Sequence, residues 1–221
     1  MAEKKDRSLE PQQARSRESL RRLLQAAAEV LGQHGLAGAT IPRIANHAGL
    51  TPGAVYRRFA SKDVLLETMI VQLLEDQEKD LRQSITPEMA AEIPFAVLAE
   101  QLINSMLVSY RKNAGLLRAV RQFGHEREGT PFWRKVMKLD ARTLEYGIDL
   151  LLRSRGEVRH PQPRAAIGLA LVMTVGAMWE LVVTPPDTKI WKGLIPTDDV
   201  TLQRELTRSL LNYLGVERKG E

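Results

Sequence analysis

The polar side chains best placed for chemistry lie between residues 40 and 62. Two short apolar patterns there, one over residues 41–48 and one containing Val55 and Phe59, are separated by Gly49, which permits a tight turn. This arrangement predicts a helix-turn-helix, whose second helix must keep its outer face free for the DNA major groove. The residues left facing outward are Thr51, Pro52, Gly53, Tyr56 and Arg57.

The distribution of charge agrees with a nucleic-acid partner. Residues 1–62 carry 11 Lys/Arg and 5 Asp/Glu, whereas residues 63–221 carry 21 and 22. The excess of positive charge therefore indicates a small segment that faces a polyanion, joined to a neutral body. A basic surface that is merely solvated is the alternative, and charge alone does not exclude it.

The sequence offers little support for an enzyme. It has no cysteine, which excludes disulfides, thiolate catalysis, Cys-ligated zinc and iron–sulfur clusters. Its four histidines are scattered without metal-ligand spacing, and neither a phosphate-binding loop nor a nucleophile elbow is present. We expect no catalytic residues, no metal and no cofactor, with an enzyme of unrecognised site as the alternative.

The expected fold class is all-α, because Leu, Ala, Arg and Glu dominate and helical spacing of apolar residues recurs nearly throughout. We expect about nine helices, over roughly residues 17–34, 41–48, 52–59, 62–84, 95–106, 116–124, 131–155, 164–183 and 198–214. Thr40, Thr51 and Ser61 are the expected N-caps of the second, third and fourth helices, and Gly35 is expected to end the first.

Two segments of the sequence indicate where in the cell the protein is expected to be. Residues 1–16 are polar and are expected to form a flexible basic arm, not a signal peptide. The stretch from Ala165 to Trp179 is uncharged, but it is shorter than a membrane span and Glu180 follows it. A bundle helix covered on two sides is the better interpretation, so we expect a cytoplasmic protein without a membrane partner.

The motif resembles the DNA-binding region of the TetR family of transcriptional regulators. The likeness covers about 50 residues, from the first helix to the start of the fourth, and many fixed positions agree. The matching residues are Thr40, Ile44, Ala45, Ala48, Gly49, Leu50, Thr51, Gly53, Val55, Tyr56, Arg58, Phe59, Ser61, Lys62, Asp63 and Leu65.

The resemblance implies DNA-binding roles. Thr40, Tyr56 and Lys62 fall on phosphate-contacting positions, and residues 51–57 fall on groove-facing ones. Arg58 stands where most members have His, and it keeps a phosphate donor. Pro42 stands where some members carry a polar DNA contact, so no relative's operator can be assumed.

Two further points are left open. Arg43 and Arg57 are candidates for reading bases, since Arg to guanine is the commonest specific contact, or for holding phosphate. A glycine such as Gly53 lowers the stability of a helix interior by about 1 kcal/mol relative to alanine. It either lets DNA approach the backbone or relieves crowding at a helix crossing.

For the body, the resemblance implies ligand binding and dimerisation through the last two helices. Apolar residues lie on all sides of the eighth helix, so it must be covered on two faces. We expect Leu169, Met173, Ala177 and Glu180 to face the subunit interior, with both faces lying in intrachain core as the alternative. The expected dimer face is Gly168, Leu171, Val172, Val175, Trp179, Val182, Leu206, Leu210 and Leu214.

A ligand pocket is expected around Met106, Tyr110, Trp133, Met137, Met173 and Glu180. Adaptable and aromatic side chains suit such a role, although ordinary core packing explains them equally. A carboxylate on an apolar helix must be paired, exposed or functional. Glu180 is therefore expected to pair with Arg118 or Arg121, or to bind a cationic ligand.

These points predict a homodimeric, ligand-responsive transcriptional regulator, a repressor that binds a palindromic operator and is released by a small molecule. The expected division is a basic arm at residues 1–16, a helix-turn-helix domain at 17–62 and a ligand-binding and dimerisation domain at 63–221. A non-specific or architectural DNA-binding protein without an effector is the main alternative. A helical adaptor would leave residues 51–62 without a purpose.

Overall fold

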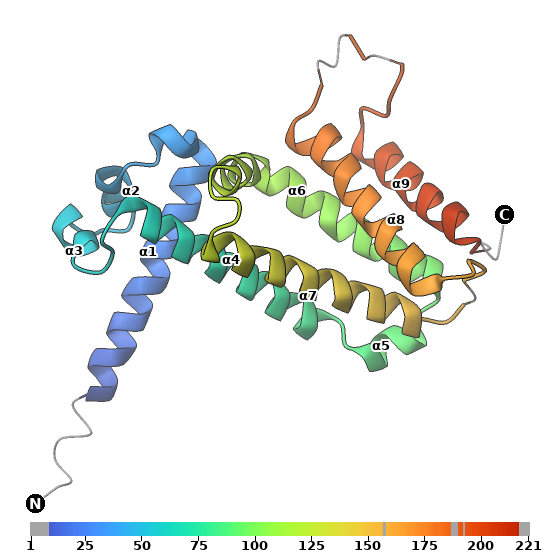
Figure 1. The fold of residues 1–221 in the computed structure, drawn as a ribbon, viewed down its shortest axis with the longest axis horizontal. Helices are drawn as coiled ribbons and strands as arrows, with labels where there is room; N and C mark the ends of the chain where they lie inside the picture. The colour runs from blue at the N-terminus through green and yellow to red at the C-terminus, as the bar shows by residue number, and fades with distance from the viewer. Residues whose placement is uncertain (1–8, 157, 187–189, 192, 217–221) are drawn as a thin grey trace, which may run out of the picture.

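The computed structural model describes residues 9–156, 158–186, 190–191 and 193–216. Within them the chain is all-α, with nine α-helices and one π-helical segment, as Figure 1 shows. The elements are α1 (Leu9–Gly38), α2 (Ile41–His47), α3 (Pro52–Tyr56), α4 (Lys62–Ser84), α5 (Pro87–Glu92), α6 (Phe95–His125), α7 (Pro131–Arg153), α8 (Pro163–Met178), the π-helix η1 (Trp179–Val183) and α9 (Asp199–Leu214).

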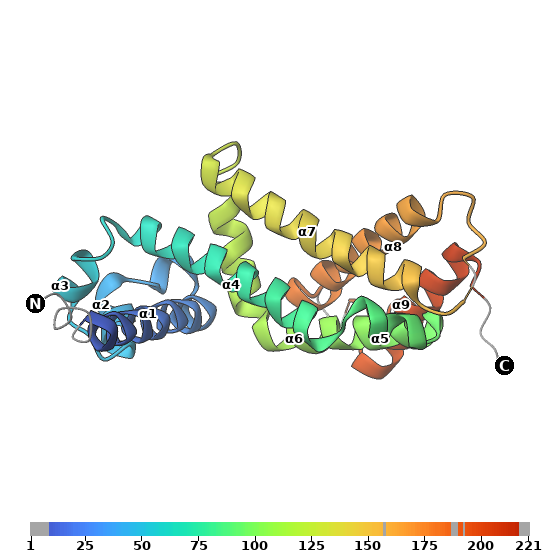
Figure 2. The ribbon, with the colours of Figure 1, turned by 90° about the horizontal axis from the view of Figure 1, so that it is seen from below.

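The helices form two groups joined by α4. The first three helices gather at one end, and α5 to α9 form a bundle at the other (Figures 1 and 2). The long helix α4 begins beside α1 and then runs along α7 into the bundle. The start of α4 therefore lies in the helix-turn-helix group, and its later turns lie in the body.

Two hydrophobic cores hold these groups together. The first joins α1, α2 and α3 to the buried start of α4, at Leu65 to Ile70. That core is completed by Ala119 and Phe123 of α6 and by Val136 of α7. The second core is built from α5 to α9, where Phe95 and Leu150 are among the fully buried side chains. The N-terminal group is thus closed by residues of the body, more than 50 positions further along the chain.

The helix boundaries differ from expectation at two places in the body. The expected gap between residues 84 and 95 contains α5, capped by Thr86, and the two helices expected over 95–124 are a single helix, α6. Gly115 lies inside α6 where it crosses α1, and a Cβ there would collide with the carbonyl oxygen of Gly32. Nine helices were expected and the described residues contain nine α-helices. However, α5 was not expected, and α6 was expected to be two helices.

The first helix is longer than expected at both ends. It begins at Leu9, so residues 9–16 of the expected flexible arm are helical, while residues 1–8 lie outside the described residues. Gly35 has the expected left-handed φ of 65°, and helical turns resume after it as far as Gly38. Gly35 therefore ends the regular helix that begins at Leu9, as expected, and a second short helical stretch follows it within α1.

The segment formed by α8 and η1 lies against α6, α7 and α9. Its 21 residues are long and apolar enough to cross a membrane by length and composition, and 44% of the apolar window is buried within the protein. Packing inside the bundle therefore explains the apolar residues on the buried side of this segment.

The two faces of α8 are not as the sequence analysis expected. Leu171 and Val182, expected at the dimer contact, are buried within the subunit, as are Leu210 and Leu214 of α9. Leu169 and Met173 were expected inside, yet they are 50% and 55% exposed, and Glu180 is exposed as well. The spacing alone could not orient a helix that is apolar all round. The outward stripe is Leu169, Val172, Met173 and Gly176.

Candidate DNA-binding surface

The helices of the helix-turn-helix begin where the sequence predicts, each with a hydroxyl cap. The Oγ1 of Thr40 accepts a hydrogen bond from the Arg43 N–H at 3.4 Å, and the Oγ1 of Thr51 accepts from the Ala54 N–H at 3.2 Å. Ser61 caps α4 in the same way through the Val64 N–H at 3.2 Å. Such caps satisfy backbone donors that a helix start leaves unpaired, and they define where each helix begins.

The turn between α2 and α3 is closed tightly. Gly49 has φ of 68°, a left-handed conformation that disfavours other residues. The Leu50 N–H donates to the Ala45 carbonyl at 2.8 Å, and Ile44 and Val55 are fully buried beneath the turn. The relative position of the two helices is therefore set by backbone hydrogen bonds and by packing of small apolar side chains.

The outer face of α3 is open to solvent. The five residues expected to face outward are all exposed, namely Thr51, Pro52, Gly53, Tyr56 and Arg57. Tyr56 is 56% exposed, which is unusual for an aromatic side chain in a packed protein. The helix ends at Tyr56, three residues earlier than expected, so its exposed face is short.

Gly53 lies on this open face. A Cβ added there would meet the Nη1 of Arg57 at 3.9 Å, and no other described atom outside its own helix backbone and neighbours would lie within 4 Å. Crowding at a helix crossing therefore does not explain this glycine. Of the two interpretations left open by the sequence, close approach of another molecule to the backbone is the one that remains.

Three cations that were expected to contact DNA also fasten α1 to the rest of this unit. The Nη1 of Arg43 donates to the Gly38 carbonyl at 2.6 Å, and the Nζ of Lys62 donates to the Leu36 carbonyl at 3.2 Å. The Nη1 of Arg58 lies 3.4 Å from the Ser16 carbonyl. Each head group keeps further N–H donors, so the same side chains can hold the frame and still bind phosphate.

One polar contact between α1 and α2 was missed by the sequence analysis. His47 was expected to be a solvated residue at a helix end, but its Nε2 lies 2.7 Å from the Oε2 of Glu29. The hydrogen bonds from His47 and Gln25 lower the pKa of the Glu29 carboxyl group. The 18-residue separation of the pair left no local signal in the sequence.

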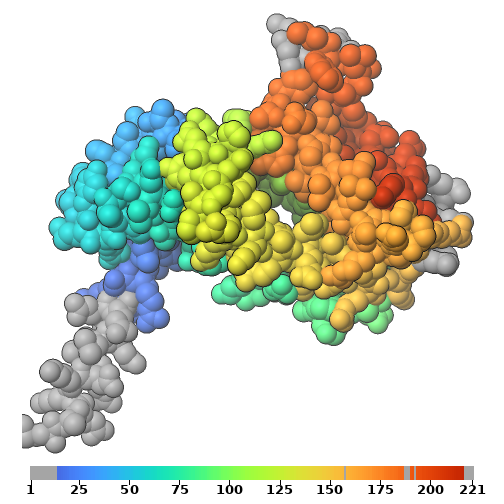
Figure 3. All heavy atoms as spheres, in the orientation of Figure 1, coloured from blue at the N-terminus to red at the C-terminus, as the bar shows by residue number. Residues whose placement is uncertain are grey.

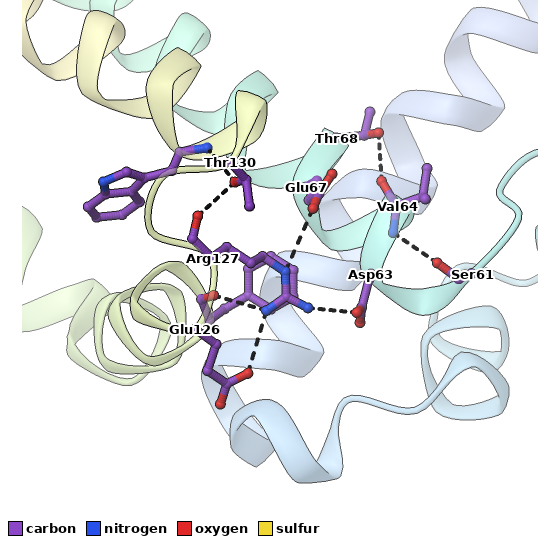
Figure 4. Close-up of polar contacts among 10 residues, drawn as sticks. Ser61, Asp63, Val64, Glu67, Thr68, Glu126, Arg127 and Thr130 are labelled. Atoms are coloured by element: carbon purple, nitrogen blue, oxygen red, sulfur yellow. Dashed lines mark hydrogen bonds and ion pairs between the residues drawn. The ribbon is translucent and has the colours of Figure 1, made fainter.

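Arg127 links this unit to the body, as Figure 4 shows. It lies in the turn between α6 and α7, where its Nη2 is 2.6 Å from Asp63 and its Nε is 3.6 Å from Glu67, both on the first turns of α4. Its guanidinium also lies over the Phe123 ring, 3.5 Å from the centroid, and donates to the Phe123 carbonyl at 3.0 Å. Only 16% of this side chain is exposed. The start of α4 is thus held directly by the α6–α7 turn.

The residues expected to line a ligand pocket are not gathered around one cavity. Tyr110 packs edge-on against Trp179, and Trp133 packs against Gly124, whereas Met137 and Met173 are exposed. Met106 packs partly buried against the core of the bundle.

Glu180 has no hydrogen bond or ion pair with a residue in the described part of the chain, so its expected pairing was wrong. Arg118 instead donates to the Val183 carbonyl, and Arg121 lies over the Trp179 ring.

A short helix-turn-helix with an open outer face is joined by α4 to a helical body. This arrangement is typical of a DNA-binding transcriptional regulator. Comparison with known proteins agrees. Residues 23–69 match the model for bacterial regulatory proteins of the tetR family. Residues 23–69 therefore form a DNA-binding domain of the TetR family, and the matches together support a transcriptional regulator of that family.

The curated relatives match only part of the chain. The HTH-type transcriptional regulator BetI 1 of Chromohalobacter salexigens is 46% identical over 56 residues, which are 25% of this chain and 28% of that protein. The match thus spans little more than a quarter of that relative's length, and the relative's activity as a whole does not transfer.

Solved structures match over nearly the whole chain, at lower identity. A putative TetR-family regulator from Mesorhizobium loti is 20% identical with a TM-score of 0.68, covering 91% of this chain and 97% of that one. FadR of Bacillus subtilis, in complex with stearoyl-CoA, is 15% identical with a TM-score of 0.60, covering 87% and 97%. At these identities the likeness establishes the fold.

Proposed function

We propose that this protein is a cytoplasmic, ligand-responsive transcriptional repressor that binds a palindromic operator as a homodimer. The observation that carries the proposal is the open face of α3, held on a buried frame by the caps at Thr40, Thr51 and Ser61. A rigid helix with a free outer face is what insertion into the major groove requires. Tyr56 and the remaining donors of Lys62 would contact phosphate, and Arg57 would reach base edges.

The dimer contact proposed here is a corrected face of α8. Leu169, Val172 and Met173 are each at least half exposed and share one stripe of the helix. Beside them a groove of about 150 Å³ between α8 and α9 is lined by residues such as Leu206 and Tyr213. An apolar stripe next to a groove suits packing against the same stripe of a second copy, which would also supply two recognition helices for one duplex.

Coupling between ligand and DNA would pass through α4. Its first turns lie in the core of the helix-turn-helix, and the Arg127 contacts fasten them to the body. A ligand that binds one position of the α6–α7 turn more tightly than another would shift the position of α4, and with it α3. The Bacillus subtilis neighbour with stearoyl-CoA supports a small-molecule effector for this fold.

The testing experiment is selection of bound duplexes from a random DNA pool with the full-length protein. Recovery of one palindromic sequence is the expected result. Tyr56→Ala should then weaken binding of all duplexes about equally, because a phosphate contact carries no sequence information, whereas Arg57→Gln should change the preferred bases. Met89→Ala, a change at an exposed residue of α5 outside both the helix-turn-helix and the proposed dimer contact, is the control for DNA contact.

Recovery of no preferred sequence would instead support a non-specific DNA-binding protein. Normal DNA affinity of the Tyr56 variant would show that α3 does not face the duplex as proposed.

A further inference from the structure

A cleft of about 700 Å³ lies where the end of α6 and the start of α7 meet η1. In Figure 3 this is where the yellow-green α6–α7 segment adjoins the orange end of α8. Its lining includes Arg118, Arg121, His125, Glu128, Trp133 and Trp179. The volume falls in the range of small-molecule sites, and the lining contains two indole rings and two guanidinium groups.

The π-helix shapes one wall of the cleft. The Thr184 N–H donates to the Trp179 carbonyl at 2.9 Å, five residues back, and the last turn is therefore wider than an α-helical one. The carbonyl of Val183, the last residue of η1, accepts a hydrogen bond from the Nη1 of Arg118 at 2.6 Å. Such π-helical turns recur at functional sites, and this one places Trp179 and Arg118 side by side on the wall.

Both arginines of the cleft, Arg118 and Arg121, keep N–H donors that can bind a ligand. Arg121 lies over the Trp179 ring, 4.8 Å from the centroid, and donates no hydrogen bond to a described residue. Arg118 uses one nitrogen on the Val183 carbonyl and keeps its other N–H groups. Among the described residues the lining contains one carboxylate, Glu128, whose Oε1 lies 2.9 Å from the Nδ1 of His125. Anion-binding donors are thus present beside aromatic faces, and the lining carboxylate already has a neighbouring side-chain partner.

We propose that this cleft binds a planar aromatic molecule that carries one carboxylate, and that this molecule is the effector. The inference rests on the proposed function and adds the chemical class of the ligand. The guanidinium groups of Arg118 and Arg121 take the carboxylate, whose geometry matches their paired N–H donors. The ring system lies against Trp179 and Trp133 through offset or edge contacts. A cationic ligand, the class that Glu180 suggested from sequence, meets like charge in this cleft.

The position of the cleft also explains how its occupant reaches DNA. Trp133 lies against Gly124 so closely that a Cβ there would be 2.7 Å from its ring. Between these two residues lies the turn that carries Arg127, whose contacts reach the first turns of α4. A ligand that moves Trp133 therefore moves the turn that holds α4.

The test uses the full-length protein and three probes of one shape: 2-naphthoate, neutral 2-naphthamide and cationic 2-naphthylmethylammonium. Affinities are measured by isothermal titration calorimetry, without DNA. We expect naphthoate to bind at least about tenfold more tightly than either analogue, because a charge-assisted hydrogen bond is added. Arg121→Gln should lower naphthoate affinity by a similar factor. Arg153→Gln, an exposed arginine at the far end of α7, should leave it unchanged.

Equal binding of the three probes, or unchanged naphthoate binding by the Arg121 variant, would overturn the proposal. So would absence of naphthoate binding up to about 1 mM, the weak end of small-molecule affinity. Release of the selected operator by naphthoate is measured separately by fluorescence anisotropy. If an operator is recovered and naphthoate does not bind, only this inference fails. If no operator is recovered, the proposed function fails whatever the cleft binds.

Discussion

Replacing Gly53 by alanine should stabilise the fold and weaken DNA binding at the same time. Alanine is favoured over glycine in a helix interior by up to about 1 kcal/mol. Gly53 lies within α3, and its φ is not positive. The nearest atom to an added Cβ is the Arg57 Nη1 at 3.9 Å, an ordinary contact, so no steric cost offsets the gain.

We therefore expect the free energy of unfolding to rise by about 0.4–1 kcal/mol. For a chain of this size, that raises the melting temperature by roughly 1–4 °C. If the duplex backbone approaches Gly53 within van der Waals distance, the same Cβ should lower operator affinity by at least about tenfold. Thermal unfolding followed by circular dichroism and fluorescence anisotropy with the selected duplex measure the two effects.

Gly147→Ala is the matched control. Gly147 lies within α7, where a Cβ would meet Leu171 Cδ1 at 3.7 Å, and it is far from α3 in sequence and structure. We expect this variant to gain stability and to keep its DNA affinity. A Gly53→Ala variant that binds DNA as tightly as the parent would refute the argument that DNA approaches this backbone. A less stable variant would refute the account of its local conformation.

Three further predictions concern the frame and the body. Arg127→Met should lower the free energy of unfolding by about 1–3 kcal/mol in urea titrations, since acidic partners on α4 and a carbonyl lose their donor. Met173→Asp should abolish dimers in sedimentation velocity and leave a folded monomer, because Met173 is exposed, whereas Leu210→Asp should unfold the chain. Because its pKa is lowered on folding, Glu29 should stabilise the fold above the ordinary carboxyl range near pH 4–5, and this contribution should disappear as the pH falls through the lowered value.

Each prediction has an outcome that contradicts it. Arg134→Met changes an exposed arginine beside the same turn and controls for loss of charge. An equal fall in the free energy of unfolding of both variants would contradict the role assigned to the Arg127 contacts. A stable dimer of Met173→Asp would place the contact elsewhere. Glu29→Gln should differ from the parent in urea titrations at neutral pH and match it in acid, so a constant difference would contradict the pH argument.

The local features of the helix-turn-helix could be predicted from sequence because their causes are local. A hydroxyl at Thr40, Thr51 or Ser61 caps a backbone N–H three residues ahead, and this requires no distant partner. Gly49 likewise supplies a left-handed turn through its own backbone freedom. The outward position of Tyr56 followed from the same short-range pattern.

The sequence had no means of orienting α8 or of locating the cleft. A helix that is apolar on every side has no polar face to mark solvent, so only its packing against α7 and α9 determined that Leu171 is buried and Met173 exposed. Nor did the sequence show that residues 95–124 form the single helix α6, whose Gly115 packs against Gly32 of α1.

The link through Arg127 and the cleft around Trp179 join residues about 60 positions apart in sequence. Periodicity along one helix carries no information about such distances, and the tertiary fold alone brings these residues together.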